Sequence, residues 1–369
     1  MARFDPADLT AFATSLVEAL GTDPAVAATV ADSLVQADLR GHGSHGIRRL
    51  AEFYPAMVEA GDILPDAEPD IERLGPTMAA IDGNRGWGHR TGRVAADLAV
   101  ELTADAGVGV VGVRNGAHMG RIGEFAEIGA ERDVILLAFV NTGGTAPMAA
   151  APGTTSRNVS VNPFVAGIPT FDALPFPIVL DAATGQVAHG KVMKRAVAGK
   201  PIPEGWAIDD DGTALRDADA FEAGEGAIFP LGGRAFGYKG TGLSLVLELV
   251  TGMVGGARVH GQPEESLVNN GAAMVAIDPT RFLDREACHE RVAALAAHLR
   301  GLDYDPDLVP GPGATGEHVL LPGEPEYQTR TKRERDGIPL DRGAIRFLDD
   351  AAAALDVKDR LAALEPSDG

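Results

Sequence analysis

The chain contains one cysteine, Cys288, among its 369 residues. A single thiol cannot form an internal disulfide or a zinc site of several thiolates, so we predict a buried and inert side chain. No apolar run approaches the ~20 residues that span a membrane. Residues Met1–Pro6 also lack the apolar core of a signal peptide. We therefore expect a soluble, cytoplasmic protein.

Positive charge is scarce. The 32 Lys and Arg residues face 53 Asp and Glu residues, which leaves a formal net charge of -21. Binding to a phosphate backbone requires clustered Lys and Arg, so this balance argues against a nucleic-acid partner. An anionic substrate must instead be drawn in by a local cationic pocket, against the field of the whole molecule.

The chain also lacks a credible Rossmann phosphate turn. Two stretches match the pattern G-x-G-x-x-G, Gly41–Gly46 and Gly311–Gly316. The fingerprint requires a strand before its first glycine, and a predicted helix precedes Gly41. The second stretch contains Pro312 and follows no buried strand, so we predict a loop there.

The remaining pattern predicts an α/β protein. Asp-Pro pairs at Asp5 and Asp23 are typical helix starts, and they precede segments with one apolar face. From about residue 76, short runs rich in Val and Ile predict strands. These runs are Met78 to Asp82, Val108 to Val113, Val134 to Val140, Pro177 to Asp181 and Met274 to Asp278, and helical patterns cover Val94 to Ala104, Leu243 to Val254 and Ala344 to Leu364. We expect a helical region of residues 1–75 that packs with residues 325–369, and an α/β domain of residues 76–324.

The glycine-rich stretch Ala37–Leu50 has the composition of an active site. It brings together Ser44, His45 and Arg49. A helix that begins near Ser44 would place His45 and Arg49 on one face. Arginine can bind a carboxylate through two hydrogen bonds, and histidine can move a proton near neutral pH, which suits a 2-hydroxy or 2-oxo acid. The alternative is a solvated, charged surface.

Three further turns carry candidate ligand-binding groups. His118 lies in Asn115–Gly120, after a predicted strand. Asp181 and Thr184 end another strand, and the pair His189 and Gly190 follows, where small neighbours let a ring or a phosphate approach the backbone. Lys239 and Gly240 precede the helix predicted from Leu243, whose amides would suit a cofactor phosphate.

Other kinds of site are less well supported. His42 and His45 form an H-x-x-H pair, with His89 and His118 elsewhere, but no acidic ligand stands at a useful spacing, so we predict no metal site. Ser44 lies beside His45 without a G-x-S-x-G motif, which argues against a serine hydrolase.

Seven motifs in one order resemble the malate/L-lactate dehydrogenase family, which includes ureidoglycolate dehydrogenase and the piperideine- and pyrroline-2-carboxylate reductases. The motifs are Ser44–Gly46 with Arg49-Leu50, Asn115–Gly120, Asn162-Pro163, Asp181–Thr184, Gly237–Gly240, Pro322–Glu324 and Gly337–Leu340. The resemblance implies a non-Rossmann nicotinamide-binding domain with a largely antiparallel sheet, a helical domain from both chain ends, and a homodimer whose active site uses both subunits.

The resemblance also implies roles for individual residues. His45 would be the proton donor or acceptor, Ser44 its relay partner and Arg49 the carboxylate clamp, while His118 resembles a second active-site histidine that serves as the base in some members. The residues that would line NAD, or NADP, are Asp181, Thr184, His189, Gly190, Lys239, Gly240, Pro322 and Gly323.

The expected function is hydride transfer between NAD(P) and a small 2-hydroxy acid/2-oxo acid pair, malate or L-lactate. Imine-reducing members resemble one another in carrying an aspartate after the His-Gly pair, where this chain has Lys191. This difference disfavours an imine reductase, because the relay carboxylate would be absent. The alternative on the same scaffold is a ureidoglycolate-type dehydrogenase or a cyclic imino acid reductase. From another class, a non-catalytic nucleotide-binding module remains, although the crowding of Ser44, His45 and Arg49 argues against it.

Overall fold

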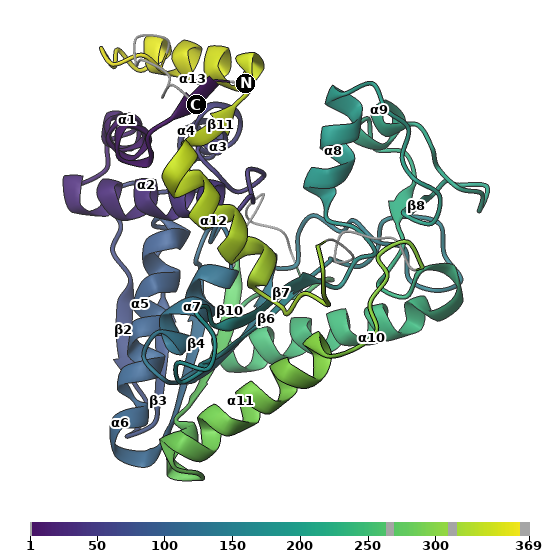
Figure 1. Ribbon diagram of the computed structural model, residues 1–369. Coiled ribbons are helices and arrows are strands. Elements are labelled where there is room, and N and C mark those ends of the chain that lie inside the picture. The colour runs from purple at the N-terminus through teal and green to yellow at the C-terminus, as the bar shows by residue number, and fades with distance from the viewer. Residues whose placement is uncertain (1, 263–268, 309–315, 362–369) are drawn as a thin grey trace.

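The computed structural model describes residues 2–262, 269–308 and 316–361. At its centre lies a seven-stranded sheet with the order β2-β3-β4-β10-β5-β6-β7 (Figure 1). Only the pair β3 and β4 is parallel in this sheet, and each other neighbouring pair is antiparallel. The strands are β2 (Asp70–Arg73), β3 (Met78–Asp82), β4 (Val108–Arg114), β5 (Ile135–Asn141), β6 (Pro163–Ile168), β7 (Ile178–Ala183) and β10 (Gly271–Ile277). The predicted α/β class and largely antiparallel sheet are confirmed, and the five predicted strands differ from the observed ones by at most three residues at either end.

Helices cover both faces of the sheet. In β4, the Cβ of an alanine at Gly109 would lie 2.2 Å from the Ala99 carbonyl oxygen of α5 (Gly88–Glu101), and one at Gly112 would lie 2.2 Å from the Val254 carbonyl oxygen. Residues 109 and 112 point to opposite faces because side chains alternate along a strand. Helices α5 and α7 (Gly123–Ala130) therefore pack on one face, and α10 (Gly233–Val250) with η1 (Thr251–Gly255) packs on the other.

The two ends of the chain form a second hydrophobic cluster. α1 (Pro6–Ala19) and α2 (Pro24–Leu39) each begin after an aspartate whose carboxylate accepts a backbone N–H, as the Asp-Pro pairs predict. β1 (Ala2–Phe4) pairs with β11 (Ile338–Leu340), and α13 (Arg342–Ala354) packs on α3 (Arg49–Glu52), so the C-terminal segment lies against the N-terminal one. α4 (Tyr54–Glu59) and α12 (Glu324–Asp336) complete this group (Figure 1).

A smaller lobe with its own apolar cluster lies beside the sheet (Figure 1). It contains α8 (His189–Val197), β8 (Ala207–Ile208), α9 (Ala218–Glu222) and β9 (Ala227–Ile228). The remaining elements are α6 (Thr103–Ala106), η2 (Pro279–Arg281) and α11 (Arg285–Arg300). The predicted α/β domain begins at residue 76, whereas β2 precedes that residue and pairs with β3 in the large sheet. The division into residues 1–75 and 76–324 stays a prediction.

One predicted helix start is wrong. The sequence predicts a helix from Leu243, whereas α10 begins at Gly233. Gly232 caps it with φ 98, a conformation that glycine adopts easily, and a kink follows at Phe236. Lys239 and Gly240 consequently lie inside the helix, and the Gly240 amide donates to the Leu231 carbonyl oxygen at 3.1 Å instead of standing free for a phosphate.

Two other predictions concern single features. Cys288 is buried, as predicted, and 8% exposed. Among the described helices, none has the length and apolar character needed to cross a membrane. The glycine-rich match at Gly311–Gly316 falls almost entirely outside the described residues.

Close packing of α5 on α7 predicts a stability effect. A Cβ at Gly92 would lie 2.1 Å from Cζ of the fully buried Phe125. We expect Gly92→Ala to lower the free energy of unfolding by about 1–3 kcal/mol, since overpacking outweighs the gain in helix propensity. Urea unfolding measures this, with Gly75→Ala as the control because its nearest neighbour would lie 3.9 Å away. Equal stability of the two variants would contradict the tight α5–α7 contact.

Candidate functional site

The loop between α2 and α3 carries Ser44 and His45. The predicted helix from Ser44 is wrong, because α3 begins only at Arg49 and both residues lie in the turns before it. The buried carboxylate of Asp38 accepts the Ile47 amide at 2.8 Å. A Cβ at Gly46 would lie 2.2 Å from this carboxylate. The buried side chain of Asp38 thus stabilises the loop, whose backbone at Ser44 and His45 is not helical.

The structure brings the predicted Ser44, His45 and His118 together. Ser44 Oγ lies 3.0 Å from Nδ1 of His45. The rings of His45 and His118 stack with centroids 5.9 Å apart and planes at 10°. Arg49 donates through Nε to the Ser44 carbonyl oxygen at 2.7 Å, and its guanidinium lies 4.7 Å from the ring centroid of Phe53. The site therefore combines two imidazoles, one hydroxyl and one guanidinium in close proximity.

Two buried side chains support His118 from behind. The Tyr54 hydroxyl lies 2.9 Å from Nδ1 of His118 and 3.1 Å from Nε2 of His89. Tyr54 and His89 are both fully buried. The sequence shows Tyr54 only as one apolar position of a helix pattern, and His89 only as a distant metal candidate, so neither was predicted to belong to this site.

Both stacked histidines are neutral at physiological pH. Burial, together with the positive charge of Arg49, lowers the pKa of His45 to about 3. The same two causes hold the pKa of His118 well below its ordinary value. Burial also lowers the pKa of His89 to about 3, with Arg93 adding to the effect, and burial raises that of Tyr54. Neutral imidazoles can donate or accept a hydrogen bond, which a proton-transfer site requires.

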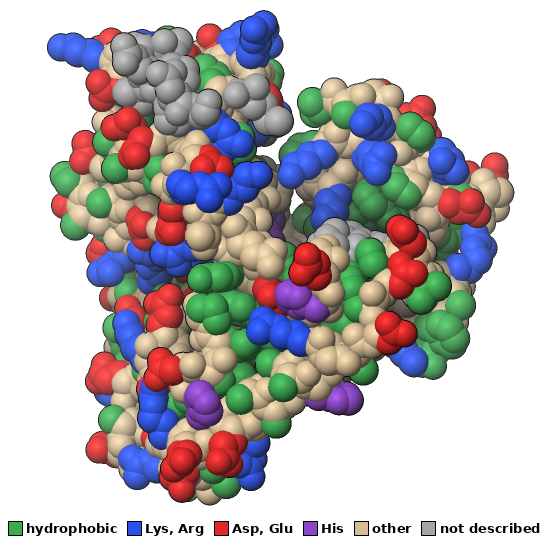
Figure 2. Space-filling model, in the orientation of Figure 1, with side chains coloured by type: hydrophobic (Ala, Val, Ile, Leu, Met, Phe, Trp, Pro, Cys, Tyr) green, Lys and Arg blue, Asp and Glu red, His purple; other side chains and the backbone are tan. Residues whose placement is uncertain are grey.

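The N-terminus of α8 forms the opposite wall. A Cβ at Gly190 would lie 2.8 Å from Cβ of Ser44, so the two walls meet there. Lys194 of α8 adds positive charge that lowers the pKa of His45. Figure 2 shows a hollow between α12 and the lobe of α8, with cationic side chains on both sides. His189, in contrast, pairs with Glu222 at 3.0 Å within that lobe.

A cavity of about 290 Å³ holds another group of predicted residues. Asp181, Pro322 and Gly323 line it together with His42 and Arg121. Asp181 accepts the amide of Gly123 at the start of α7, at 2.8 Å. Arg121 is almost fully buried and donates to Glu127 at 2.6 Å, while its Nε and Nη1 have no hydrogen-bond partner in the described structure.

Thr184 and Gly240 lie in a third group. Leu231 links them, because its amide donates to the Thr184 carbonyl oxygen at 2.8 Å and its carbonyl oxygen accepts the Gly240 amide. Oγ1 of Thr184 is a buried oxygen without a partner among the described residues. The Nζ of Lys239 lies 5.3 Å from the ring centroid of Phe236.

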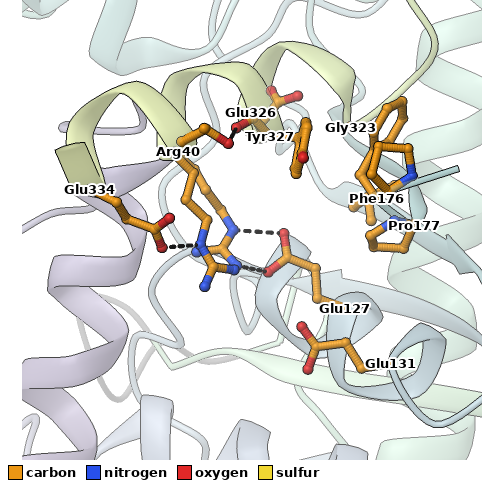
Figure 3. A pocket seen from close by; sticks show the side chains of 13 residues that line it. Arg40, Glu127, Glu131, Phe176, Pro177, Gly323, Glu326, Tyr327 and Glu334 are labelled. Carbon is orange, nitrogen blue, oxygen red and sulfur yellow. Dashed lines mark hydrogen bonds and ion pairs between the residues drawn. The ribbon is translucent and has the colours of Figure 1, made fainter.

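A larger cavity, of about 430 Å³, adjoins the one at Gly323 (Figure 3). Arg40 and Glu127 point toward each other in it, joined at 2.9 and 2.8 Å. Arg330 is held by Glu334 at 2.7 Å. Both arginines that line this cavity, Arg40 and Arg330, are thus paired with carboxylates.

Comparison with known proteins gives a consistent result. A profile described as malate/L-lactate dehydrogenase matches residues 4–349. The chain belongs to the malate/L-lactate dehydrogenase family. It is 31% identical over 364 residues to a malate dehydrogenase of Pyrococcus abyssi, covering 96% of each chain. It is 33% identical over 323 residues to an L-sulfolactate dehydrogenase of Methanocaldococcus jannaschii, covering 86% and 87%. A malate dehydrogenase structure from Entamoeba histolytica superposes with a TM-score of 0.88 at 28% identity, covering 97% of this chain and 99% of that one.

Membership of the malate/L-lactate dehydrogenase family makes the chain an oxidoreductase of 2-hydroxy acids and implies a nicotinamide cofactor. The residues fit such a group. Thr184 Oγ1 and Asn162 Oδ1 are buried oxygens without partners in the described structure, as expected where a polar ligand completes the hydrogen bonding. No set of three or more His, Cys, Asp or Glu within the described ranges is arranged to hold a metal ion.

The buried Asp38 predicts a pH effect. Burial raises its pKa from 3.8 to about 6, so the folded protein binds this proton more tightly than the unfolded chain. The resulting stability is complete below pH 3.8 and is lost as the pH rises through 6. Between pH 4 and 7 we expect wild type to lose roughly 2–3 kcal/mol relative to Asp38→Asn, which has no proton to lose. Urea unfolding at several pH values tests this, and a stability difference independent of pH would contradict it.

Proposed function

We propose that the protein transfers a hydride between NAD(P) and a small 2-hydroxy acid/2-oxo acid pair, malate or L-lactate. The observation that carries the proposal is the neutral pair of stacked histidines beside Arg49. Relatives at about 30% identity support this substrate class, since they include malate, sulfolactate and lactate dehydrogenases.

Arg49 binds the substrate carboxylate in this proposal. A guanidinium suits it because it can form two parallel hydrogen bonds with one carboxylate. Further cationic groups, Arg121 and Lys194, also act on His45, so the site suits an anion with one or two negative charges. One of the two histidines, His45 or His118, holds the proton of the substrate hydroxyl, and Ser44 contacts His45 directly. These groups are half-buried, which limits the access of water to the reacting atoms.

The cofactor residues proposed are Asp181, Thr184, His189, Gly190, Lys239, Gly240, Pro322 and Gly323. When bound, a nicotinamide ring supplies the acceptor or donor of the hydride. We propose NAD in preference to NADP, with the adenosine end in the larger cavity beside Gly323. Arg40 and Arg330 there are already paired, and Glu131 and Glu326 add negative charge, which disfavours a 2′-phosphate.

The alternative is a ureidoglycolate-type dehydrogenase or a cyclic imino acid reductase. Lys191, at the position after Gly190, is exposed and cannot serve as a relay carboxylate, which disfavours the reductase. Absorbance of NADH or NADPH, measured with oxaloacetate, pyruvate, other 2-oxo acids and piperideine-2-carboxylate, decides between these. Turnover of piperideine-2-carboxylate alone would overturn the proposal, and turnover of any substrate excludes a non-catalytic binding module.

We also propose a homodimer formed through α10. The inner face of this helix packs on the sheet, with Ser244, Leu247 and Glu248 buried. The outer face of α10 exposes the large apolar side chains Tyr238, Leu245, Val246 and Leu249, and Met253 of the adjoining η1 is 79% exposed. A contiguous apolar face of this kind marks an interaction surface.

Removing Arg49 tests the carboxylate clamp. We expect Arg49→Ala to raise KM for the 2-oxo acid, with a smaller change in kcat. The rise in KM should correspond to roughly 2–5 kcal/mol of lost binding free energy, as for a lost charge pair. Steady-state kinetics measure this, with the neighbouring Arg48→Ala as the control. An unchanged KM in Arg49→Ala would rule out this role.

Charge on α10 tests the dimer. We expect the double variant Leu245→Glu and Leu249→Glu to sediment as a monomer, because two buried carboxylates cost far more than the interface gains. Leu295→Glu on α11 is the control, since Leu295 is also an exposed apolar residue, at 60%. Analytical ultracentrifugation gives the answer, and a monomeric wild type would end the proposal.

A further inference from the structure

The two active-site histidines have different hydrogen-bond partners at Nδ1. His118 Nδ1 accepts the backbone N–H of Gly120 at 3.3 Å and also faces the Tyr54 hydroxyl. A backbone N–H can only donate. A hydrogen on Nδ1 of His118 would therefore point at another hydrogen, so the neutral ring carries its hydrogen on Nε2.

The side chains behind His118 support the same tautomer. When Tyr54 donates to His118, its oxygen accepts from Nε2 of His89 at 3.1 Å. His89 then has no hydrogen on Nδ1, which is the buried nitrogen without a partner in the described structure. The reverse order would bury an unsatisfied N–H at that atom, and such groups are rare in folded proteins.

The backbone beside His89 and His118 leaves the hydrogen bonds through Tyr54 little freedom to rearrange. Gly120 has φ +72, and a Cβ there would lie 2.5 Å from Nε2 of His89. A Cβ at Gly88 would lie 2.4 Å from the carbonyl oxygen of His118. The ring of His89 thus packs against the main chain at Gly120, and the backbone of His118 packs against that of Gly88.

His45 meets a different partner. Its Nδ1 faces only the hydroxyl of Ser44, at 3.0 Å, among the contacts in the described structure. A hydroxyl donates or accepts, so it accommodates either tautomer of His45 and also the imidazolium. Protonation of His118 at Nδ1, in contrast, would require the hydrogen bonds that link His118, Tyr54 and His89 to reverse their direction.

We propose that Tyr54 and His89 are positioning residues that hold His118 as a neutral Nε2–H donor to the substrate oxygen, and that His45 carries the transferred proton. This rests on the proposed 2-hydroxy acid chemistry. In the oxidation direction, neutral His45 donates Nδ1–H to Ser44 and leaves Nε2 bare. The hydroxyl proton of the substrate moves to that Nε2, and the resulting imidazolium keeps its hydrogen bond to Ser44. His118 neither gains nor loses a proton.

The tautomer is measurable without turnover. In the full chain with ¹⁵N-labelled histidine, long-range ¹H–¹⁵N correlations distinguish a ring protonated at Nε2 from one protonated at Nδ1. We expect His118, assigned from the signal lost in His118→Gln, to be protonated at Nε2. Tyr54→Phe should give a mixture of tautomers, while Tyr304→Phe should change nothing because the Tyr304 hydroxyl has no partner in the described structure. Protonation of His118 at Nδ1 in wild type would overturn the proposal.

Kinetics separate the two histidines. Glutamine can donate a hydrogen bond but cannot carry a proton at neutral pH. We expect His45→Gln to lower kcat for 2-oxo acid reduction by roughly 10²–10⁴-fold and to remove the fall in rate at high pH. His118→Gln should lose less and keep that pH dependence. The opposite pattern would refute the assignment.

Tyr54→Phe gives a third kinetic test. We expect it to lower kcat about tenfold, as for one lost hydrogen bond, with KM little changed because Arg49 still holds the carboxylate. An equal loss in Tyr304→Phe would show a merely structural effect. If wild type reduces no 2-oxo acid, the proposed function fails, and the tautomer of His118 still decides the present inference.

Discussion

The hydrogen bond from the Ile47 amide to the buried Asp38 carboxylate anchors the loop after α2, which carries Ser44 and His45. Ser44 and His45 belong to no helix or strand, so no regular backbone ladder holds them. Asp38 is buried at the end of α2, and its backbone oxygen also accepts from Arg333 of α12. Helix α2 from the N-terminal part and α12 from the C-terminal part therefore meet at Asp38, and the site depends on their packing.

Burial and charge act together on the histidines. Burial and Arg49 keep His45 neutral in the free protein, because an imidazolium there would be desolvated beside a cation. In the role proposed for Arg49, a substrate carboxylate paired with it would remove the second of these causes and would raise the pKa of His45. The proposal thus couples binding of the anion to proton uptake, at a locally cationic site in a protein of net charge -21.

Local patterns predicted the elements, and they failed where distant residues decide. The strand Met78–Asp82 was predicted residue for residue because its periodicity is local. The start of α10 was missed because Gly232 and Gly233 allow a helix ten residues before the apolar pattern begins. Arg49, His45 and His118 were proposed from their chemistry, and the fold places them close together. Tyr54 and His89 were not, since 35 positions separate them and only the fold joins their side chains.

The misleading G-x-G-x-x-G match has a physical explanation in the same loop. In a phosphate turn, glycines leave room for an anionic ligand to approach the backbone. At Gly46, the missing Cβ makes room for the carboxylate of Asp38, which would lie 2.2 Å away from it. That carboxylate already accepts the Ile47 amide, so a phosphate would meet a negative charge where it needs a donor. The glycine pattern thus records an anion close to the backbone, and the anion is the protein's own side chain.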